Sequence, residues 1–275
     1  MAKRPDSEGH EGWDEYAPFY DWENARTLNR RDVPFWQTVA LAADGLVLEL
    51  GCGTGRIAAP LGRAGVHLVG IDRSNPMLAL ARRRVVRARL GQRVRLVRGD
   101  IRAVPFHDAA FATVLAPYGV LQSLLRERDL ATTLSAVHRV LRPEGTFGVE
   151  LVADLPSWDE YQKRVSLKGW RRRRGGAHVT LVETVRQDRR RRVTIFNQEF
   201  TEQHGHQRNA RRFVLTFRTL SVPQMVRRLE KAGFEITALL GDYRGGPWHA
   251  GAEVWIILAR RRWDGRGVRA TQAIW

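Results

Sequence analysis

Short apolar runs alternate with longer stretches of helical periodicity through the first half of the chain. The pattern predicts strands at 46–50, 67–71, 93–98, 111–116 and 145–152, and helices at 13–23, 32–43, 55–64, 75–90 and 127–141. Strands and helices that alternate in this way form a parallel sheet connected by right-handed crossovers. We therefore expect a doubly wound α/β fold, with ligands bound beyond the carboxyl ends of its strands.

The pattern changes at about residue 156. Three runs rich in β-branched and aromatic residues follow at 179–185, 193–200 and 213–217, with polar turns at 188–190 and 202–209. Their alternation predicts strands with one covered and one solvated face, so we expect an inserted antiparallel meander. The α/β pattern then resumes with a helix at 222–232 and strands at 234–241 and 252–259.

A glycine turn follows the first predicted strand, where the sequence reads Gly51-Cys52-Gly53-Thr54-Gly55. Glycine lacks a Cβ atom, so the main chain of such a turn can approach a ligand closely. Glu49 precedes the turn, and Asp72 ends the next predicted strand. A carboxylate at the position of Asp72 can accept hydrogen bonds from both hydroxyls of a ribose, so the turn is predicted to bind a nucleotide.

Arg56 narrows the choice of nucleotide. The dinucleotide fingerprint G-x-G-x-x-G would place its last glycine at position 56, where this chain has arginine. NAD needs its pyrophosphate on an open helix N-terminus, so an arginine at this position argues against NAD.

Four motifs, in the same order along the chain, resemble those of a known family. The sequences E-L-G-C-G-T-G-R and V-G-I-D-R-S resemble motifs I and II of class I S-adenosylmethionine-dependent methyltransferases. Gly99-Asp100-Ile101 and the turn at 141–146 match two further elements, and the resemblance covers about residues 45–152. It implies S-adenosyl-L-methionine as cofactor, S-adenosyl-L-homocysteine as product, and an acid, Asp100, that faces the adenine amino group. It also implies a Rossmann-like sheet whose last strand is antiparallel.

The flanks resemble small-molecule N-methyltransferases, such as glycine N-methyltransferase and sugar N,N-dimethyltransferases. These relatives carry a β-rich insertion at the same point, which covers the site as a lid. They also have a Tyr-x-x-x-Tyr pattern near the N-terminus, which Tyr16 and Tyr20 match. In such relatives an N-terminal tyrosine covers the methionine part of the cofactor. The segment from Arg218 to Met225, followed by Ala232-Gly233-Phe234, matches their C-terminal pattern more loosely.

These patterns predict the domain organisation. We expect a Rossmann-like domain that binds S-adenosylmethionine, formed by 13–155 and 220–262. An antiparallel β lid or substrate subdomain is expected at 156–219, a disordered N-terminus at 1–12 and a loose tail at 263–275.

The motifs also predict site residues. The cofactor is expected to contact Tyr20, Glu49, Gly51, Cys52, Gly53, Thr54, Gly55, Asp72, Arg73, Met77, Asp100, Ile101 and Ala116. The acceptor is expected to contact Tyr16, Tyr118, Glu150, Arg218 and His249. Methyltransferases that act on exocyclic amines of bases resemble one another in the pattern (Asp/Asn)-Pro-Pro-(Tyr/Phe). This chain has Ala116-Pro117-Tyr118, without the acid or amide, which argues against that class. The sequence identifies no catalytic residue and predicts no metal site.

The amino-acid composition limits which classes of binding partner are expected. The formal charge is +17, and residues 156–219 alone hold 16 basic and 6 acidic side chains. Because only four of the 46 basic residues are lysine, codon usage with a solvated face explains this excess as readily as binding of an acidic molecule or of nucleic acid. The single cysteine, Cys52, excludes an intrachain disulfide, and no apolar run reaches the ~18 residues of a membrane helix. With no apolar leader at the start, we expect a cytoplasmic protein.

Three functional hypotheses follow. The first is an enzyme that transfers a methyl group to a small-molecule acceptor, at nitrogen rather than oxygen, by in-line displacement. The second is a methyltransferase of RNA or another polyanion that uses the basic insertion as a platform. The third is a non-catalytic module that keeps the cofactor pocket, which the intact Glu49, Asp72 and Asp100 disfavour.

Overall fold

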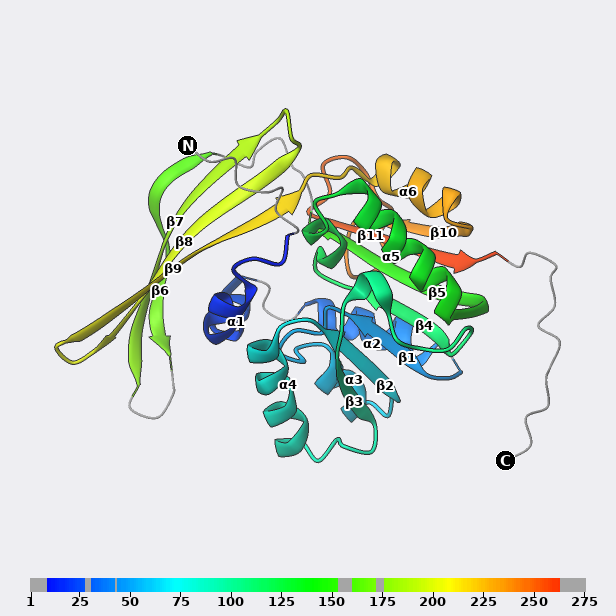
Figure 1. Cartoon of the computed structure of the whole chain (residues 1–275), viewed down its shortest axis with the longest axis horizontal. Coiled ribbons are helices and arrows are strands. Elements are labelled where there is room, and N and C mark those ends of the chain that lie inside the picture. Colours follow the sequence, from blue (N-terminus) through cyan, green and yellow to red (C-terminus); the bar gives the residue numbers. More distant parts are fainter. Residues whose placement is uncertain (1–8, 28–30, 43, 153–159, 172–175, 263–275) are drawn as a thin grey trace.

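A computed structural model describes residues 9–27, 31–42, 44–152, 160–171 and 176–262. Its main sheet has seven strands in the order β10-β11-β5-β4-β1-β2-β3 (Figure 1). The strands are β1 (Val47–Leu50), β2 (Leu68–Asp72), β3 (Val94–Arg98), β4 (Phe111–Ala116), β5 (Leu141–Val152), β10 (Phe234–Leu240) and β11 (Val254–Arg261). Only β11 runs antiparallel to its neighbours, which confirms the Rossmann-like fold class and the antiparallel last strand.

Helices cover both faces of this sheet. They are α2 (Asp32–Leu41), α3 (Ala58–Arg63), α4 (Asn75–Arg87), α5 (Glu127–Val140) and α6 (Val222–Lys231), with short 3₁₀ turns η1 (Ile101–Ala103) and η2 (Val120–Ser123). One buried cluster joins the sheet to α5 and α6, and a second joins it to α2, α3 and α4. Because β1, β2 and β4 run parallel, their carboxyl ends lie at the same edge of the sheet.

A second, four-stranded antiparallel sheet lies apart from the first (Figure 1). It is formed by β6 (Tyr161–Arg171), β7 (Ala177–Asp188), β8 (Val193–His204) and β9 (Gln207–Arg218). The sequence predicted three strands here. It missed β6 because that edge strand is mostly polar and exposed, as edge strands often are. The predicted turn at 202–209 is also wrong, since β8 and β9 pair as far as His204 and Gln207.

Helix α1 (Trp13–Thr27) joins the two sheets. In Figure 1 it lies between the second sheet and α4. Its buried residues Tyr16, Phe19 and Trp22 pack with Phe200 and Met77, so one hydrophobic cluster connects the second sheet to the main domain. Phe19 stacks on Phe200 with ring centroids 4.2 Å apart.

The segment at 9–12 differs from the predicted disorder. The Trp13 indole N–H donates a hydrogen bond to the Gly9 carbonyl, and a Cβ at Gly9 would lie 1.6 Å from the Ser123 oxygen. This close approach holds the segment against η2. Residues 1–8 and the predicted tail at 263–275 lie outside the described residues.

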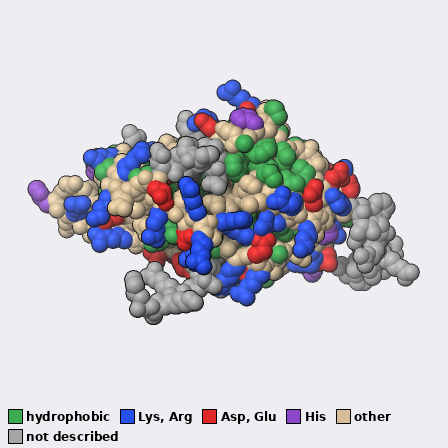
Figure 2. Space-filling model, turned by 90° about the horizontal axis from the view of Figure 1, so that it is seen from above, with side chains coloured by type: hydrophobic (Ala, Val, Ile, Leu, Met, Phe, Trp, Pro, Cys, Tyr) green, Lys and Arg blue, Asp and Glu red, His purple; other side chains and the backbone are tan. Residues whose placement is uncertain are grey.

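The surface agrees with the composition. Basic side chains are spread over the face in Figure 2, with acidic ones among them. Within the described residues, every helix is too short or too polar to cross a bilayer.

Candidate functional site

The glycine turn forms the floor of the site. Gly51, Gly53 and Gly55 have φ angles of +59°, +52° and +72°, a region that favours glycine. A Cβ at Gly51 would lie 2.3 Å from Cγ2 of Val120. The turn therefore needs glycine for its backbone conformation and, at Gly51, for its packing against η2.

Hydrogen bonds from the backbone to Asp72 stabilise this turn. Oδ2 of Asp72 accepts a hydrogen bond from the Gly53 N–H at 2.8 Å, and its Oδ1 accepts one from the Ser74 N–H at 2.8 Å. Burial raises the pKa of Asp72, although these backbone donors act in the opposite direction. The carboxylate thus ties the end of β2 to the turn after β1.

A cavity of about 250 Å³ opens above the turn. Of the predicted cofactor residues, those that line it are Tyr20, Glu49, Gly51, Cys52, Gly53, Asp72, Arg73, Met77, Asp100 and Ile101. Thr54, Gly55 and Ala116 do not line it. The Thr54 hydroxyl instead donates to Asp21 at 2.7 Å, and Ala116 is buried in the sheet. Local motifs thus bring most of the predicted set together.

Arg56 is the buried cation of the site. Its Nη1 donates to Oδ1 of Asp32 at 2.8 Å, and its guanidinium lies 5.6 Å from the centre of the Tyr118 ring. Burial lowers the pKa of Arg56, but Tyr20 and Asp32 raise it above its ordinary value. The arginine therefore stays charged beside the cavity, where a dinucleotide site would have glycine.

Glu49 lines the same cavity as this charge. Its side chain is buried, and among the described residues no donor reaches its Oε2. Burial raises the pKa of Glu49 to about 8; Arg56 lowers it, whereas Asp72 and Asp32 raise it further. The site thus contains a buried carboxyl with an acceptor atom available to a cationic ligand.

This raised pKa predicts the pH dependence of stability. An unfolded glutamate has a pKa of ~4.3, so between about pH 5 and 8 the folded state holds a proton that the unfolded state has lost. The free energy of unfolding should therefore fall as pH rises through this window, by up to a few kcal/mol. Guanidinium unfolding of Glu49→Gln without ligand should show a shallower pH slope, whereas Glu15→Gln, on the exposed side of α1, should keep the wild-type slope. An unchanged slope in Glu49→Gln would contradict this interpretation.

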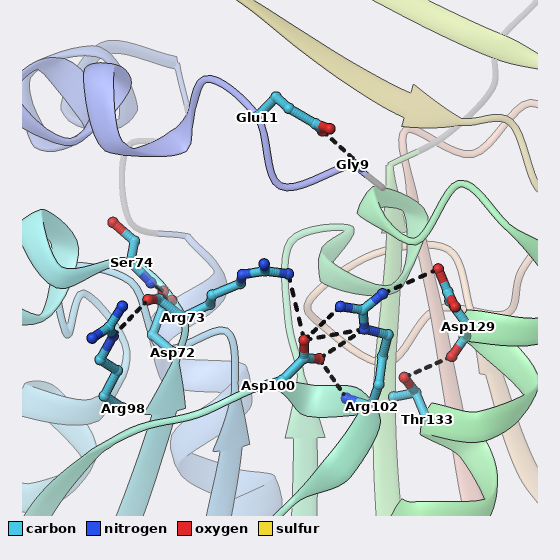
Figure 3. Close-up of polar contacts among 10 residues, drawn as sticks. All are labelled: Gly9, Glu11, Asp72, Arg73, Ser74, Arg98, Asp100, Arg102, Asp129 and Thr133. Atoms are coloured by element: carbon cyan, nitrogen blue, oxygen red, sulfur yellow. Dashed lines mark hydrogen bonds and ion pairs between the residues drawn. The ribbon is translucent and has the colours of Figure 1, made fainter. Parts of the chain in front are cut away.

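Asp100 has partners that the sequence did not predict (Figure 3). Its Oδ1 accepts hydrogen bonds from the Arg102 backbone N–H at 2.9 Å and from Nε at 3.0 Å, while Oδ2 contacts Nη2 at 2.7 Å. Arg102 also reaches Asp129 on α5 at 3.3 Å. Partial burial raises the pKa of Asp100, but Arg102 and Arg73 lower it below its usual value. Asp100 is therefore an ionised, positioned acceptor at the cavity wall.

Tyr118 separates this cavity from a second one. It has a φ of +53°, which is unusual for a tyrosine and marks local strain. Its backbone N–H donates to Oε2 of Glu150 at 3.0 Å, and Oε1 of Glu150 accepts from the Tyr243 hydroxyl at 2.7 Å. Buried Glu150 therefore holds the Tyr118 loop, and it lines neither cavity.

The second cavity, of about 280 Å³, lies between α1 and the second sheet. It shares Trp13, Tyr118 and Phe217 with the first cavity. Of the residues predicted to contact the acceptor, Tyr16 and Arg218 line this cavity, whereas His249 is exposed in the loop between β10 and β11 and lines neither cavity. The Tyr-x-x-x-Tyr pattern thus places Tyr20 at one cavity and Tyr16 at the other.

Many wall residues were not predicted from the sequence. At the first cavity they include His10, Trp13, Asp14, Ser74, Arg102, Val120, Leu124 and Phe217, and at the second Glu23, Thr27, Glu183, Thr194 and Gln198. One signal was available, since Tyr16, Tyr20, Glu23 and Thr27 share a helical face by spacing. In the described part of the chain, no group of three or more His, Cys, Asp or Glu side chains could hold a metal.

Comparisons with known proteins agree with this geometry. Residues 47–145 match a family model described as a methyltransferase domain. A demethylmenaquinone methyltransferase of Lactiplantibacillus plantarum is 36% identical over 48% of this chain and 56% of that relative. The cypemycin N-terminal methyltransferase of a Streptomyces species is 26% identical over 78% and 83% of the two chains. The chain spans about half the length of several curated relatives that it matches.

The fold also matches solved structures. The sugar N-methyltransferase KedS8 of Streptoalloteichus superposes with a TM-score of 0.72 and 16% identity, over 96% of this chain and 97% of that one. At this identity the likeness establishes the fold, and it extends over both the main sheet and the inserted one.

Proposed function

We propose that this chain, whose residues 47–145 match the methyltransferase-domain model, uses S-adenosylmethionine to methylate a small-molecule acceptor at nitrogen. The observation that carries the proposal is the pair of adjoining cavities. One is floored by the glycine turn and Asp72, and the other is covered by the inserted sheet. Two substrates in adjoining cavities suit a direct group transfer, because catalysis then consists mainly of alignment and exclusion of water.

The residues of the first cavity fit the cofactor. The turn has no Cβ atoms at Gly51 and Gly53 to block a ligand, and Asp72 is placed to accept from ribose hydroxyls. Oε2 of Glu49 is an acceptor for the ammonium of the methionine part, and Asp100 for the adenine amino group. When bound, the sulfonium supplies a methyl group that is already activated for displacement. The chain itself must hold the acceptor in line.

Tyr118 is placed to define that line. It lies on the wall common to both cavities, and its strained backbone is fixed by Glu150 and by Gly119 in the left-handed region. Burial raises the pKa of its hydroxyl, so the phenol stays neutral. We infer that Tyr118 packs beside the reacting methyl group and sets the distance between the two substrates.

Relatives support nitrogen as the acceptor atom. The cypemycin relative, which matches 78% of this chain, is named for N-terminal methylation, and the matched sugar enzyme is named for N-methylation. A relative named for demethylmenaquinone shows that the domain also serves other acceptors.

The experiment is a transfer assay with tritiated S-adenosylmethionine and the full chain, screened against fractions of cell metabolites and RNA. We expect label in small-molecule amines, and mass spectrometry should place the methyl group on nitrogen. Label on hydroxyl or carbon positions would overturn the choice of nitrogen. Cofactor binding without any transfer would favour a non-catalytic module.

The same assay tests the polyanion alternative. Several arginines of the second sheet are engaged within the protein, since Arg171 pairs with Glu202, Arg212 with Glu199 and Arg218 with Glu127. The run at 172–174 lies outside the described residues. Label in RNA, with binding that weakens steeply as salt increases, would favour this alternative.

A further inference from the structure

The second cavity has two carboxylates and two amides on walls that also carry aromatic, aliphatic and threonine side chains and one arginine, Arg218. Trp13, Phe196 and Leu215 supply apolar surface, whereas Glu23, Glu183 and Gln198 supply acceptor atoms. The net charge of the second sheet is strongly basic, so the acidic interior is opposite in sign to the exterior. This contrast identifies the cavity as a site with its own chemical preference.

Glu23 reaches the cavity from α1. It lies seven residues after Tyr16 on the same helical face, and both side chains line the cavity. Among the described residues, no donor reaches the buried Oε2 of Glu23. Burial raises the pKa of Glu23 to about 7; the Tyr16 hydroxyl acts against this rise, and the charge of Glu183 adds to it.

Glu183 reaches the cavity from β7 and is firmly positioned. Its Oε1 accepts hydrogen bonds from the Tyr161 hydroxyl and from the Ser166 hydroxyl at 3.3 Å. Its Oε2 accepts from the Gln198 amide at 2.6 Å. Three donors on neighbouring strands therefore fix this carboxylate at the cavity wall.

Gln198 provides an independent sign of a ligand. Its side chain is 5% exposed and lines the cavity, and within the described chain its Oε1 has no donor. A buried carbonyl without a partner costs about 1–3 kcal/mol. Together with Oε2 of Glu23, the cavity thus presents two acceptor atoms that await donors.

We propose, on the basis of the methyltransferase function proposed above, that the acceptor enters the second cavity as a protonated amine that Glu23, Glu183 and Gln198 hold, and that Glu23 removes its proton before methyl transfer. An ammonium group supplies several N–H donors, which matches the available acceptors. A carboxylate or phosphate ligand would instead be repelled by the two acids, Glu23 and Glu183. The lining offers it one cation, Arg218, among the described residues.

The proton step balances. An N–H bond of the ammonium breaks, and its proton passes to the Glu23 carboxylate, which leaves a lone pair on nitrogen. That pair then forms the bond to the methyl carbon as the carbon–sulfur bond breaks, and the electrons of that bond remain on sulfur. The products are the N-methylammonium and S-adenosylhomocysteine, and Glu23 returns its proton to solvent on release. A carboxylate with a raised pKa suits an amine better than a hydroxyl, whose proton is far less acidic.

The groups that face Glu23 set the expected pH dependence. They are Tyr16 and Thr27 on α1, Tyr118 after β4, Glu183 on β7 and Arg218 on β9. Because Glu23 must be ionised to take the proton, the rate with a saturating amine should rise as pH increases through the pKa of Glu23.

The binding test uses three ligands of similar size and different charge: benzylamine, benzyl alcohol and benzoate. They are titrated into the full chain saturated with S-adenosylhomocysteine. We expect benzylamine to bind about tenfold or more tightly than benzyl alcohol, and benzoate most weakly. Glu23→Gln and Glu183→Gln should remove the preference for the amine, whereas Glu15→Gln, the same change at an exposed position of α1, should retain it.

Each outcome is decisive. Equal binding of the three ligands, preference for benzoate, absence of binding by all three, or an amine preference that persists in Glu23→Gln would overturn the proposal. Affinity for S-adenosylhomocysteine should be unchanged in Glu23→Gln, which shows that the variant is folded and that the first cavity is intact.

A kinetic test separates this inference from the proposed function. With an amine identified by the transfer assay, Glu23→Gln should lower kcat at least about tenfold, as loss of a proton acceptor does, and should abolish the rise with pH. If the wild type methylates the amine and Glu23→Gln keeps the same pH profile, the inference fails while the function stands. If the wild type methylates no amine, the proposed function fails, and the three-ligand titration still tests the site.

Discussion

Replacing Gly51 with alanine is expected to abolish cofactor binding. The φ of +59° costs an L-residue about 1–2 kcal/mol, and the added Cβ would lie 2.3 Å from Cγ2 of Val120. Overpacking of this kind costs about 1–3 kcal/mol more, unless the turn or η2 moves. Because both line the first cavity, either movement distorts the site. Calorimetry with S-adenosylhomocysteine should show no measurable heat, and the midpoint of guanidinium unfolding should fall.

Two variants identify the cause of this loss. Gly65→Ala introduces the same kind of strain, at a φ of +98°, where a Cβ meets nothing within 4 Å. It should lose stability without loss of cofactor affinity. Adding Val120→Ala to Gly51→Ala removes the clash but not the strain, so affinity should recover in part. If Gly51→Ala alone binds normally, the packing of the turn against η2 is not required for the site.

Replacing Asp72 with asparagine is expected to weaken cofactor binding by about tenfold to a hundredfold. One oxygen becomes an N–H₂ group, which cannot accept from Gly53 or Ser74, and the remaining amide carries no charge toward the ribose. Hydrogen bonds to charged groups contribute about 1.5–3 kcal/mol, which corresponds to this range.

Asp242 offers the matched control. It lies in the loop after β10, is exposed, and its Oδ1 also accepts from two backbone donors, Arg244 at 2.7 Å and Gly246 at 2.9 Å. Asp242→Asn should therefore disturb a similar local turn without changing the affinity. Equal affinities of wild type and Asp72→Asn, measured by calorimetry, would remove Asp72 from the ribose site.

The helices and strands were predictable where buried and exposed side chains alternate regularly along the chain. The alternation of strand and helix and the glycine turn depend on local sequence, so seven strands and their helices lie within a few residues of the predicted ranges. Strand β6 was not predictable, because an exposed edge strand buries few side chains and so lacks the alternation that marks the other strands. The polar ends of β8 and β9 were read as a turn for the same reason.

The residues of the first cavity were largely predictable from the sequence, whereas those of the second cavity were not. The cofactor residues follow successive strands of one sheet, so their motifs report their position. The carboxylates of the second cavity come from α1 and β7, far apart in sequence, and only the folded chain brings Glu23 and Glu183 together. The partners of Glu150 were not predictable either, because a position at a strand end does not reveal that the Tyr243 hydroxyl and the Tyr118 N–H donate to its two oxygens.

Calorimetric titration of the full chain with S-adenosylmethionine, S-adenosylhomocysteine and NAD tests the central claim most directly. We expect saturable binding of the two sulfur compounds to one site per chain and no heat with NAD, because Arg56 stands where a dinucleotide site needs glycine. Absence of heat with both sulfur compounds in folded protein, or binding of NAD in their place, would contradict it.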